Sequence, residues 1–476
     1  MCIFEKMEYD LHSGLGSRVV TENDIVSTST EIFTLPEKEV ALIDGRTSLY
    51  RPLHINDTGP YEFIIPGKST QYLQMSSIRM YVKAKLTLTN GAEFDDTKKI
   101  ALCNLPGSSL FSQIEVELNQ KLIPLLTNTN AATKAYLETL CSYGEDARNS
   151  HLRSCGFVLD TDGEFDNFAN QVPARYPKGA ANLDDEGANQ KFIPGSKYNN
   201  GHGLRRELVK GSRVFELEFP IQSDFLQCMR LLPPMITLGL KLTRNSDLYL
   251  LQSPEEGTAY KIHFIDMEIN ARHVSLEQKI YDRHMQRWAT ELAVFPIGRT
   301  DIQKFTFAPS LSVASIPNLY RGALPKHLLV CILDSANYEG SLATNPFNFK
   351  NGGCTHAYVR YNGEQIPNPR YEPDFSGNNF VKMYRGFYDQ IGIGMSDEGT
   401  AITPDMFKGG SMLIPFDFTP DKCNRFHLHP SEQGVIDFEM GFKTALTTPL
   451  TVICVATFDT LIGIDKQGNV QVQPAL

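Results

Sequence analysis

Alternation of apolar and polar residues is the strongest pattern along this chain. In segment 78–89, IRMYVKAKLTLT, apolar side chains occupy every second position from Ile78 to Leu88, and most positions between them hold Arg, Lys or Thr. The same period of two recurs in segments 114–119, 214–219 and 236–242. Because successive side chains of a strand point to opposite faces of a sheet, these segments are predicted to be half-buried β-strands.

Helical patterns are few. Segment 131–143 follows Asn130, a candidate N-cap, and places Tyr136, Leu137 and Leu140 on one face. Segment 275–293 opens with Ser275, carries mixed charges and is predicted to be a surface helix joining two larger units. The chain is therefore predicted to be all-β with a few short helices and with Pro, Gly and Asn turns between many short strands.

Two short segments suggest an internal duplication. VELNQKLIP at 116–124 and VRYNGEQIP at 359–367 share Val, Asn, Ile and Pro in register. Helical candidates follow both copies, at 131–143 and 378–390. Later strand segments also correspond in order: 215–225 with 413–423, and Ile236, Leu238, Leu240 and Leu242 with Ile436, Phe438, Met440 and Phe442. This colinear order predicts two tandem eight-stranded jelly rolls, each a sandwich of two antiparallel sheets.

The length of 476 residues also favours two domains, because single cores stop growing at roughly 250–300 residues. The predicted organisation is an N-terminal arm at 1–55, a first jelly roll at 56–274, a linker helix at 275–293 and a second jelly roll at 294–476. The first copy holds extra polar residues at 145–210, which are predicted to form a long surface loop.

Four longer motifs resemble one known family. They are NLPGSSLFSQIEVELN, YLETLCSYGEDA, GSRVFELEFPIQSDF and NPFNFKNGGCTHAYVRYNGEQIP, which begin at residues 104, 136, 211 and 345. Together they are similar to the double jelly-roll major capsid proteins (hexon-like proteins) of Polinton/Maverick elements and adintovirus-like DNA viruses. The resemblance spans roughly residues 50–465, and the motifs lie along both halves in the family's order.

The resemblance implies a structural protein of the virion and not an enzyme. Subunits of this family form homotrimeric capsomers with a pseudo-hexameric outline, which tile an icosahedral shell around a double-stranded DNA genome. Two similar domains per chain, tripled by symmetry, approximate a hexagon. The implied partners are further copies of the chain and a single jelly-roll penton protein at the vertices, with a packaging ATPase encoded elsewhere. The implied location is the capsid, assembled inside the host cell in the nucleus.

Composition and charge agree with this expectation. The net charge is −10 and neither terminus carries a run of Lys and Arg, which disfavours direct nucleic-acid binding. The apolar runs are too short to span a bilayer, and the first residues lack the apolar core of a signal peptide. Nine cysteines without paired spacing favour reduced thiols in an intracellular compartment.

Two motifs offer metal-binding alternatives. HLHPSE places His427, His429 and Glu432 as in the metal motif of cupins, which are also jelly rolls, but the carboxylate comes too early and no completing segment follows. These residues are predicted to lie at a strand end or a subunit contact. DTDGEFD places Asp160, Asp162 and Asp166 around a glycine, faintly like a calcium loop. A solvated acidic loop is the preferred prediction there, because the full calcium spacing and its terminal Glu are missing.

The remaining motifs indicate no active site. GLGSRV at 14–19 lacks a complete dinucleotide fingerprint, and NDT at 56–58 is a glycosylation sequon without a secretory route. Cys141 and the aromatic residues Tyr384, Phe387 and Tyr388 are predicted to pack in the core. We therefore assign no catalytic, cofactor-binding or metal residues, and expect no cofactor. The alternatives left open are a tandem β-sandwich carbohydrate-binding (lectin-like) module and a bicupin-like metalloenzyme using His427 and His429.

Overall fold

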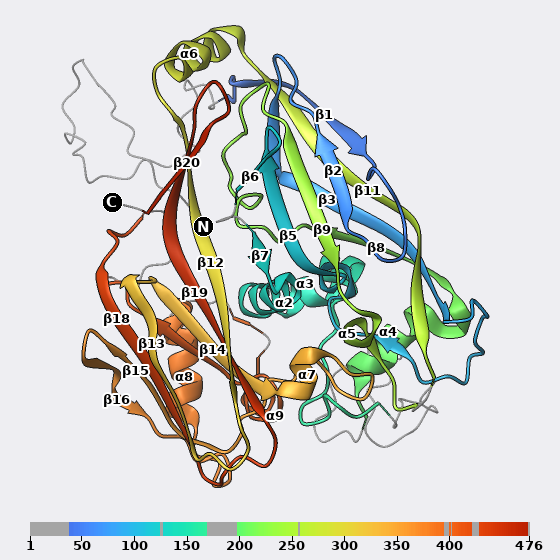
Figure 1. Ribbon diagram of the computed structural model, residues 1–476, viewed down its shortest axis with the longest axis vertical. Coiled ribbons are helices and arrows are strands. Elements are labelled where there is room, and N and C mark those ends of the chain that lie inside the picture. Colours follow the sequence, from blue (N-terminus) through green and yellow to red (C-terminus); the bar gives the residue numbers. More distant parts are fainter. Residues whose placement is uncertain are drawn as a thin grey trace, which may run out of the picture.

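The computed structural model describes residues 38–123, 127–168, 198–255, 258–394, 399–400, 402–420 and 428–474. In this part of the chain, two β-sandwiches lie side by side, with helices α2 and α7 between them and α6 above both (Figure 1). None of the described helices is long and apolar enough to cross a membrane. The GLGSRV motif lies outside the described residues.

The first sandwich consists of two antiparallel sheets with the strand orders β1-β11-β3-β8 and β2-β9-β5-β6. Strand β7 pairs with β5, and the short pair β4 and β10 lies apart. The strands are β1 (Leu42–Tyr50), β2 (Tyr61–Ile65), β3 (Tyr72–Leu88), β4 (Ala101–Leu102), β5 (Phe111–Leu118), β6 (Lys121–Leu122), β7 (Asn128–Thr129), β8 (Val214–Pro220), β9 (Leu238–Arg244), β10 (Leu251–Gln252) and β11 (Tyr260–Leu276).

The second sandwich has the orders β12-β19-β14-β17 and β13-β18-β15-β16, with β20 beside β19. Its strands are β12 (Ala293–Phe307), β13 (Val313–Ala323), β14 (His327–Asp334), β15 (Cys354–Tyr361), β16 (Glu364–Tyr371), β17 (Leu413–Asp417), β18 (Gln433–Phe442), β19 (Leu450–Ile464) and β20 (Val470–Pro474). When the eight main strands of each sandwich are counted in chain order, both sandwiches have the sheets 1-8-3-6 and 2-7-4-5. The prediction of two tandem eight-stranded jelly rolls is confirmed.

Short helices connect or cover these strands. They are α1 (Pro106–Ser109), α2 (Ala131–Ser142), α3 (Glu145–Asn149), α4 (Asn200–Val209), α5 (Asp247–Leu250), α6 (Gln278–Trp288), α7 (Ser335–Glu339), α8 (Val381–Gln390) and α9 (Pro404–Gly409), with 3₁₀ turns η3 (His151–Cys155) and η4 (Lys210–Ser212). Helix α6 connects β11 of the first jelly roll to β12 of the second, and most of its side chains are exposed. Helices α2 and α8 occupy equivalent places, because each lies between the fifth and sixth main strands of its jelly roll.

The alternating segments form the core as their pattern predicts. On β3, the side chains of Ile78, Met80, Val82, Ala84 and Leu86 are all buried between the two sheets. Residues of both jelly rolls belong to one continuous apolar cluster. The two sandwiches are therefore packed against each other and not merely tethered.

The two similar nine-residue segments occupy the same place in both jelly rolls, the hairpin of the fourth and fifth main strands. Asn119 and Asn362 both have positive φ values, 49° and 51°. Each side-chain oxygen accepts a hydrogen bond from the backbone of the seventh strand or its approach, from Thr237 N–H at 2.8 Å and from Val435 N–H at 2.9 Å. The sequence similarity therefore reports a shared turn, whose left-handed geometry favours Asn and Gly.

This turn gives a testable prediction. The second turn residue also has positive φ in both copies, 64° at Gln120 and 89° at Gly363. Because a left-handed conformation costs a non-glycine residue about 1–2 kcal/mol, Gln120→Gly is expected to stabilise the protein by about 1 kcal/mol. Gly363→Gln is expected to destabilise it by a similar amount, and thermal unfolding of both variants measures this. If both substitutions move the unfolding midpoint in the same direction, the turn geometry does not control stability here.

Three expectations need correction. Part of the expected arm at 1–55 is strand β1, which pairs with β11 along its length. Its side chains are mostly exposed, so the sequence lacks the alternation that marks a half-buried strand. The proposed correspondence of Leu240 with Met440 is off by two residues. Leu240 pairs with Val116, and the equivalent Val359 pairs with Phe438, so Leu240 corresponds to Phe438. A shift of two keeps every side chain on its face, so the pattern alone cannot detect it.

The third correction concerns residues 145–210. Their described parts are not a surface loop, because they include α3, η3 and α4. They also bury Leu152, Phe157, Phe165 and Arg205. This segment packs between the first jelly roll and the connection that follows β14 in the second.

Candidate functional site: the junction of the two jelly rolls

The junction has an aromatic centre. Tyr136 on α2 stacks on Phe347, which follows α7, with ring centroids 4.1 Å apart and an interplanar angle of 7°. Tyr249 on α5 meets the same ring edge-on at 6.2 Å. Tyr136 and Phe347 are fully buried, and this burial raises the pKa of the Tyr136 hydroxyl. The predicted apolar face of α2 therefore packs against the other jelly roll.

The prediction that the Asn130 side chain caps the N-terminus of α2 is wrong. The Asn130 side chain makes no capping hydrogen bond. Its oxygen instead accepts a hydrogen bond from the Tyr338 hydroxyl of α7 at 2.5 Å. The helix formed as predicted, but this side chain contacts the opposite domain.

A buried ion pair lies on the side of the junction next to β12. Lys134 on α2 is 1% exposed, and its Nζ lies 2.7 Å from Asp224 and 3.0 Å from Glu138. Burial disfavours the ammonium charge, but the two carboxylates outweigh it and raise the pKa of Lys134. Asp224 also accepts hydrogen bonds from the backbone N–H of Thr300 at 2.9 Å and from its hydroxyl at 3.0 Å. One carboxylate thus connects α2 to the edge strand of the second jelly roll.

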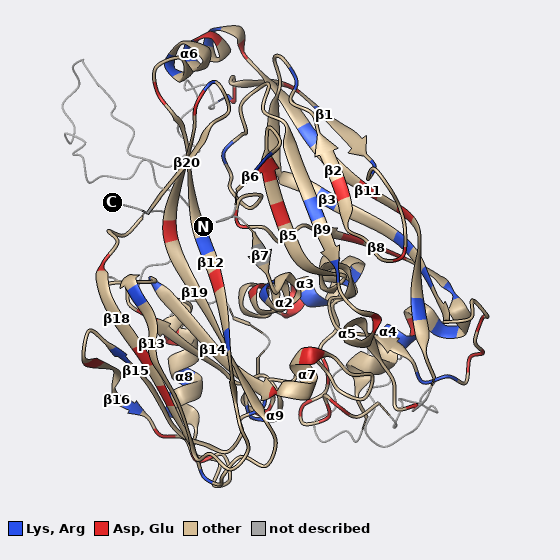
Figure 2. Cartoon of the chain, viewed as in Figure 1, with Lys and Arg blue, Asp and Glu red and all other residues tan. Residues whose placement is uncertain are grey.

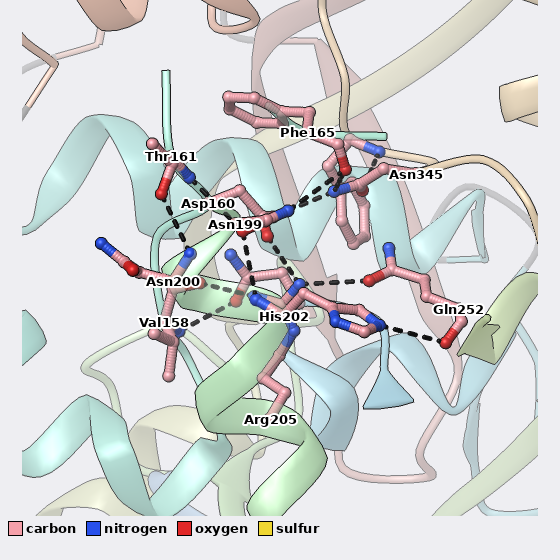
Figure 3. A network of polar contacts seen from close by, with 12 residues as sticks. Val158, Asp160, Thr161, Phe165, Asn199, Asn200, His202, Arg205, Gln252 and Asn345 are labelled. Atoms are coloured by element: carbon pink, nitrogen blue, oxygen red, sulfur yellow. Dashed lines mark hydrogen bonds and ion pairs between the residues drawn. The ribbon is translucent and has the colours of Figure 1, made fainter. Parts of the chain in front are cut away.

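A larger polar network is built around Arg205 of α4 (Figure 3). Its fully buried guanidinium donates to the carbonyl oxygens of Leu102 and Val158 at 2.9 and 2.8 Å, and to Asp160 Oδ1 at 2.7 Å. The other oxygen of Asp160 accepts from Asn345 Nδ2 at 2.9 Å. Since Asn345 belongs to the second jelly roll, Asp160 joins the α4 segment to the opposite domain.

Two further groups complete this network. Asp166 accepts hydrogen bonds from the Asn345 backbone at 2.7 Å and the Asn348 side chain at 2.6 Å. His202 Nε2 lies 3.2 Å from the Gln252 carbonyl oxygen. Burial, assisted by the charge of Arg205, lowers the pKa of His202 to about 3. His202 is therefore neutral at physiological pH and donates its ring N–H to that carbonyl.

The prediction of a solvated acidic loop at 160–166 is therefore wrong. Asp160 is 2% exposed and accepts a hydrogen bond from Arg205, and Asp166, whose side chain is 30% exposed, accepts one from Asn348. The calcium-loop alternative gains no support, since the described residues contain no group of three or more His, Cys, Asp or Glu side chains that could hold a metal ion. These carboxylates hold the two jelly rolls together.

Asp162 is the exception in this loop and gives a pH prediction. Both its carboxylate oxygens are buried without a hydrogen-bond partner among the described residues. The adjacent Gly163 N–H bonds to the Gly409 carbonyl oxygen, at the end of α9, at 2.9 Å. Burial, assisted by the charge of Asp405, raises the pKa of Asp162 from 3.8 to about 6.

Because the folded-state pKa lies above the unfolded one, the folded protein binds more protons between these two values. The contribution of Asp162 to stability therefore falls as the pH rises from about 4 to 6 and stays low above that range. Asp162→Asn is expected to raise the urea unfolding midpoint at pH 7.5 and to change it little at pH 4.5. Asp146→Asn removes an exposed carboxylate as a control for general charge effects. An equal shift for Asp162→Asn at both pH values would contradict the prediction.

A cavity of about 370 Å³ lies at one end of the second jelly roll and is lined by two of the three candidate ligands of the cupin-like motif, His429 and Glu432. Glu432 accepts a hydrogen bond from Tyr361, whose ring stacks on Phe418 at 4.9 Å. The His429 backbone donates to Asp459, which pairs with Lys326 at 2.7 Å. His427 lies outside the described residues. The structure thus places His429 and Glu432 in one cavity but gives them different protein partners.

The other candidate residues contribute to packing. Cys141 packs against the core, and burial raises the pKa of its thiol to about 12. The described cysteines are all free thiols. Phe387 is fully buried, and the Tyr384 hydroxyl bonds to the Ile402 carbonyl oxygen at 2.9 Å. Asn56 accepts a hydrogen bond from the Thr58 backbone within an exposed turn. None of these contacts assembles reactive groups.

The fold and the junction together define a chain in which two jelly rolls of identical topology form one packed body. Comparisons with known proteins agree with this description. No protein-family model matches the sequence. An uncharacterized protein of Caenorhabditis elegans is 24% identical over 426 residues, which cover 86% of this chain and 92% of that protein.

Solved structures share the fold. A chain of the Sputnik virophage structure has a TM-score of 0.63 and 13% identity, over 98% of this chain and 94% of its own length. The Faustovirus major capsid protein has a TM-score of 0.52 and 9% identity, over 94% and 93%. A chain of the PBCV-1 virus capsid has a TM-score of 0.52 and 12% identity, over 93% and 100%. The Faustovirus chain is named as a major capsid protein and the PBCV-1 chain belongs to a virus capsid, and the chain has the double jelly-roll fold that it shares with these structures.

Proposed function

We propose that this chain is a major capsid protein, a structural and non-enzymatic subunit of a virion. The observation that carries the proposal is the match to the Sputnik virophage chain, which extends over 98% of this chain and so includes both jelly rolls and their connection. The junction supports the same role. Its buried aromatic stack and ion pairs hold the two sandwiches in one orientation, as a building block of a regular shell requires.

The finer proposal is a homotrimer with a pseudo-hexameric outline that tiles an icosahedral shell around double-stranded DNA. The identical topology of the two jelly rolls supports it, because three copies of a two-domain body can approximate six equivalent lobes. The motif resemblance to Polinton/Maverick and adintovirus-like proteins adds the proposed source, assembly in the host nucleus and a single jelly-roll penton partner. Figure 2 shows acidic and basic residues interspersed along the strands of both jelly rolls, which suits a shell protein that leaves the genome to other proteins.

Light scattering after size exclusion, with negative-stain images of the same peak, tests this proposal. The expected mass is about 160 kDa, three times the chain mass of 53.4 kDa. The expected images show six-lobed particles or closed shells. A chain that stays monomeric at every concentration and salt condition, and never assembles, would contradict the proposal.

The lectin-like alternative has one observation in its favour. The cavity of the second jelly roll is lined by the aromatic rings of Tyr361, Phe418 and Phe458 beside charged groups, and aromatic rings with nearby polar groups are typical of small-ligand sites. A glycan array with the wild-type chain and with Phe418→Ala tests it. Binding that the substitution abolishes would favour this function, and an array without any binding would exclude it.

A further inference from the structure

An amine and two carboxylates meet in the interior beside α2. Lys134 Nζ lies 2.7 Å from Asp224 Oδ1 and 3.0 Å from Glu138 Oε1. The side chains of Lys134 and Asp224 are 1% and 3% exposed, whereas the side chain of Glu138 is 32% exposed. Lys134 and Asp224 are therefore shielded from water, and Glu138 can exchange protons with the solvent.

Neighbouring groups hold both carboxylates in place. The Thr300 backbone N–H donates to Asp224 Oδ2 at 2.9 Å, and the Thr300 hydroxyl donates to Oδ1 at 3.0 Å. Gln227 Nε2 donates to Glu138 Oε2 at 3.1 Å, so the other oxygen, Oε1, faces Lys134. Donors on a carboxyl group stabilise the oxyanion that forms when a nucleophile adds to its carbon. Thr300 therefore favours addition at Asp224, and Gln227 fixes Glu138 beside the amine.

The Lys134 amine is held by charge and not by an aligned hydrogen bond. Its Nζ has no partner of normal hydrogen-bond geometry among the described residues, although two carboxylate oxygens lie within 3.0 Å. The nearer of these oxygens, Asp224 Oδ1, is bonded to Cγ, the carbon that an amine attacks when an amide forms. Nζ therefore lies close to this carbon, and no aligned hydrogen bond has to break before it approaches.

The ion pair is the resting state of this site. Burial lowers the pKa of Lys134, but the two carboxylates together outweigh burial and raise that pKa. Bond formation starts from the neutral pair, in which a proton has moved from Nζ to Asp224. The interior narrows the gap between the two forms, because a neutral amine and a neutral acid lose less hydration there than two ions do. The reaction is therefore expected to be slow and to occur once in each chain.

We propose that Lys134 and Asp224 form an isopeptide bond, with Glu138 as the proton carrier. Nζ adds to Asp224 Cγ, so an N–C bond forms and Cγ becomes tetrahedral. The bond from Cγ to Oδ1 then breaks, and this oxygen leaves as water with two of the three ammonium protons. Glu138 Oε1 accepts these protons from Nζ and delivers them to Oδ1. The ammonium and the carboxylate together contain all atoms of the amide and the water, so no oxidant or reductant takes part.

The bond links α2 to the connection that follows β8, and both belong to the first jelly roll. Helix α2 lies between the two sandwiches (Figure 1). Because Thr300 belongs to β12 of the second jelly roll, its two donors reach Asp224 only when the jelly rolls are packed together. The bond therefore fixes α2 in the position that the packed junction gives it, and it restricts the unfolded chain as a disulfide does. This inference goes beyond the proposed capsid function and does not depend on it.

Mass spectrometry of the denatured wild-type chain, after incubation of the folded protein at neutral pH, tests the inference. The expected mass is lower than the sequence mass by one water molecule. Trypsin is expected to leave the bond at Lys134 uncut and to release a branched peptide that joins this segment to the one around Asp224. Asp224→Ala is expected to have the full mass. Glu138→Gln is expected to form the bond about 100-fold more slowly, the usual contribution of a positioned acid–base group.

A second lysine provides a matched control within the same digest. Lys350 Nζ lies 2.6 Å from Asp334 and 3.6 Å from Asp166, but the Lys350 side chain is 41% exposed. Because water reaches this pair, its peptides are expected to remain unlinked. A wild-type chain that keeps its full mass would overturn the inference, and so would a loss of water that maps to Lys350 or to another site. Bond formation at an unchanged rate in Glu138→Gln would overturn the role of Glu138.

Discussion

Asp160→Asn is expected to lower the free energy of unfolding by about 3–5 kcal/mol, because it removes one partner of a buried ion pair. Arg205 is fully buried, so its guanidinium would remain in the interior without a counter-charge. The substitution also weakens the 2.9 Å hydrogen bond from Asn345 of the second jelly roll. Urea unfolding followed by the fluorescence of Trp288, the chain's one tryptophan, measures the effect.

Two control variants sharpen this experiment. Lys83→Gln removes an exposed ion pair with Glu216 at 3.0 Å and is expected to leave the unfolding midpoint nearly unchanged. Adding Arg205→Met to Asp160→Asn is expected to recover part of the loss, since the uncompensated charge is then gone. If Asp160→Asn behaves like the Lys83 control, the network does not stabilise the junction.

Phe347→Ala is expected to destabilise the protein by about 3–5 kcal/mol, the usual cost of removing a buried aromatic ring. The ring is fully buried between Tyr136 and Tyr249 of the first jelly roll, so its loss leaves a cavity in the junction itself. Chemical denaturation measures the loss. The cavity lies between the two sandwiches and weakens their contact. Limited proteolysis is therefore also expected to cut Phe347→Ala faster than the wild type.

A conservative variant distinguishes ring stacking from simple burial. Phe347→Leu keeps most of the apolar volume and is expected to lose clearly less stability than Phe347→Ala. A double-mutant cycle of Phe347→Leu with Tyr136→Leu isolates the stacked pair, whose coupling is expected to be about 0.5–1.5 kcal/mol. A coupling near zero would mean that the two rings contribute only through their buried area.

Both predictions concern the feature that the proposed capsid role needs most, a fixed orientation of the two jelly rolls. If the junction loosens, the two jelly rolls no longer keep the spacing that a ring of identical subunits requires. Junction variants are therefore expected to reduce assembly into the proposed trimer.

The sequence alone determined the sandwich class, the repeated strand order of the two halves and the approximate place of the strands. Period-two alternation such as that from Ile78 to Leu88 depends only on neighbours along the chain, and the turn at Asn119 and Asn362 needs a residue that tolerates positive φ. Both signals are local. They can therefore be read without knowing what lies across the sheet.

Only the tertiary structure decided which polar residues are buried and which groups they pair with. Asp160 sits in a segment whose composition predicts a solvated loop, but its partners are Arg205 and Asn345, and the second of these is 185 residues away. Strand β1 was not predicted, because most of its side chains are exposed and only its backbone pairing with β11 makes it a strand. Burial of a polar group requires partners that satisfy it, and those partners come from distant parts of the chain that a local pattern does not contain.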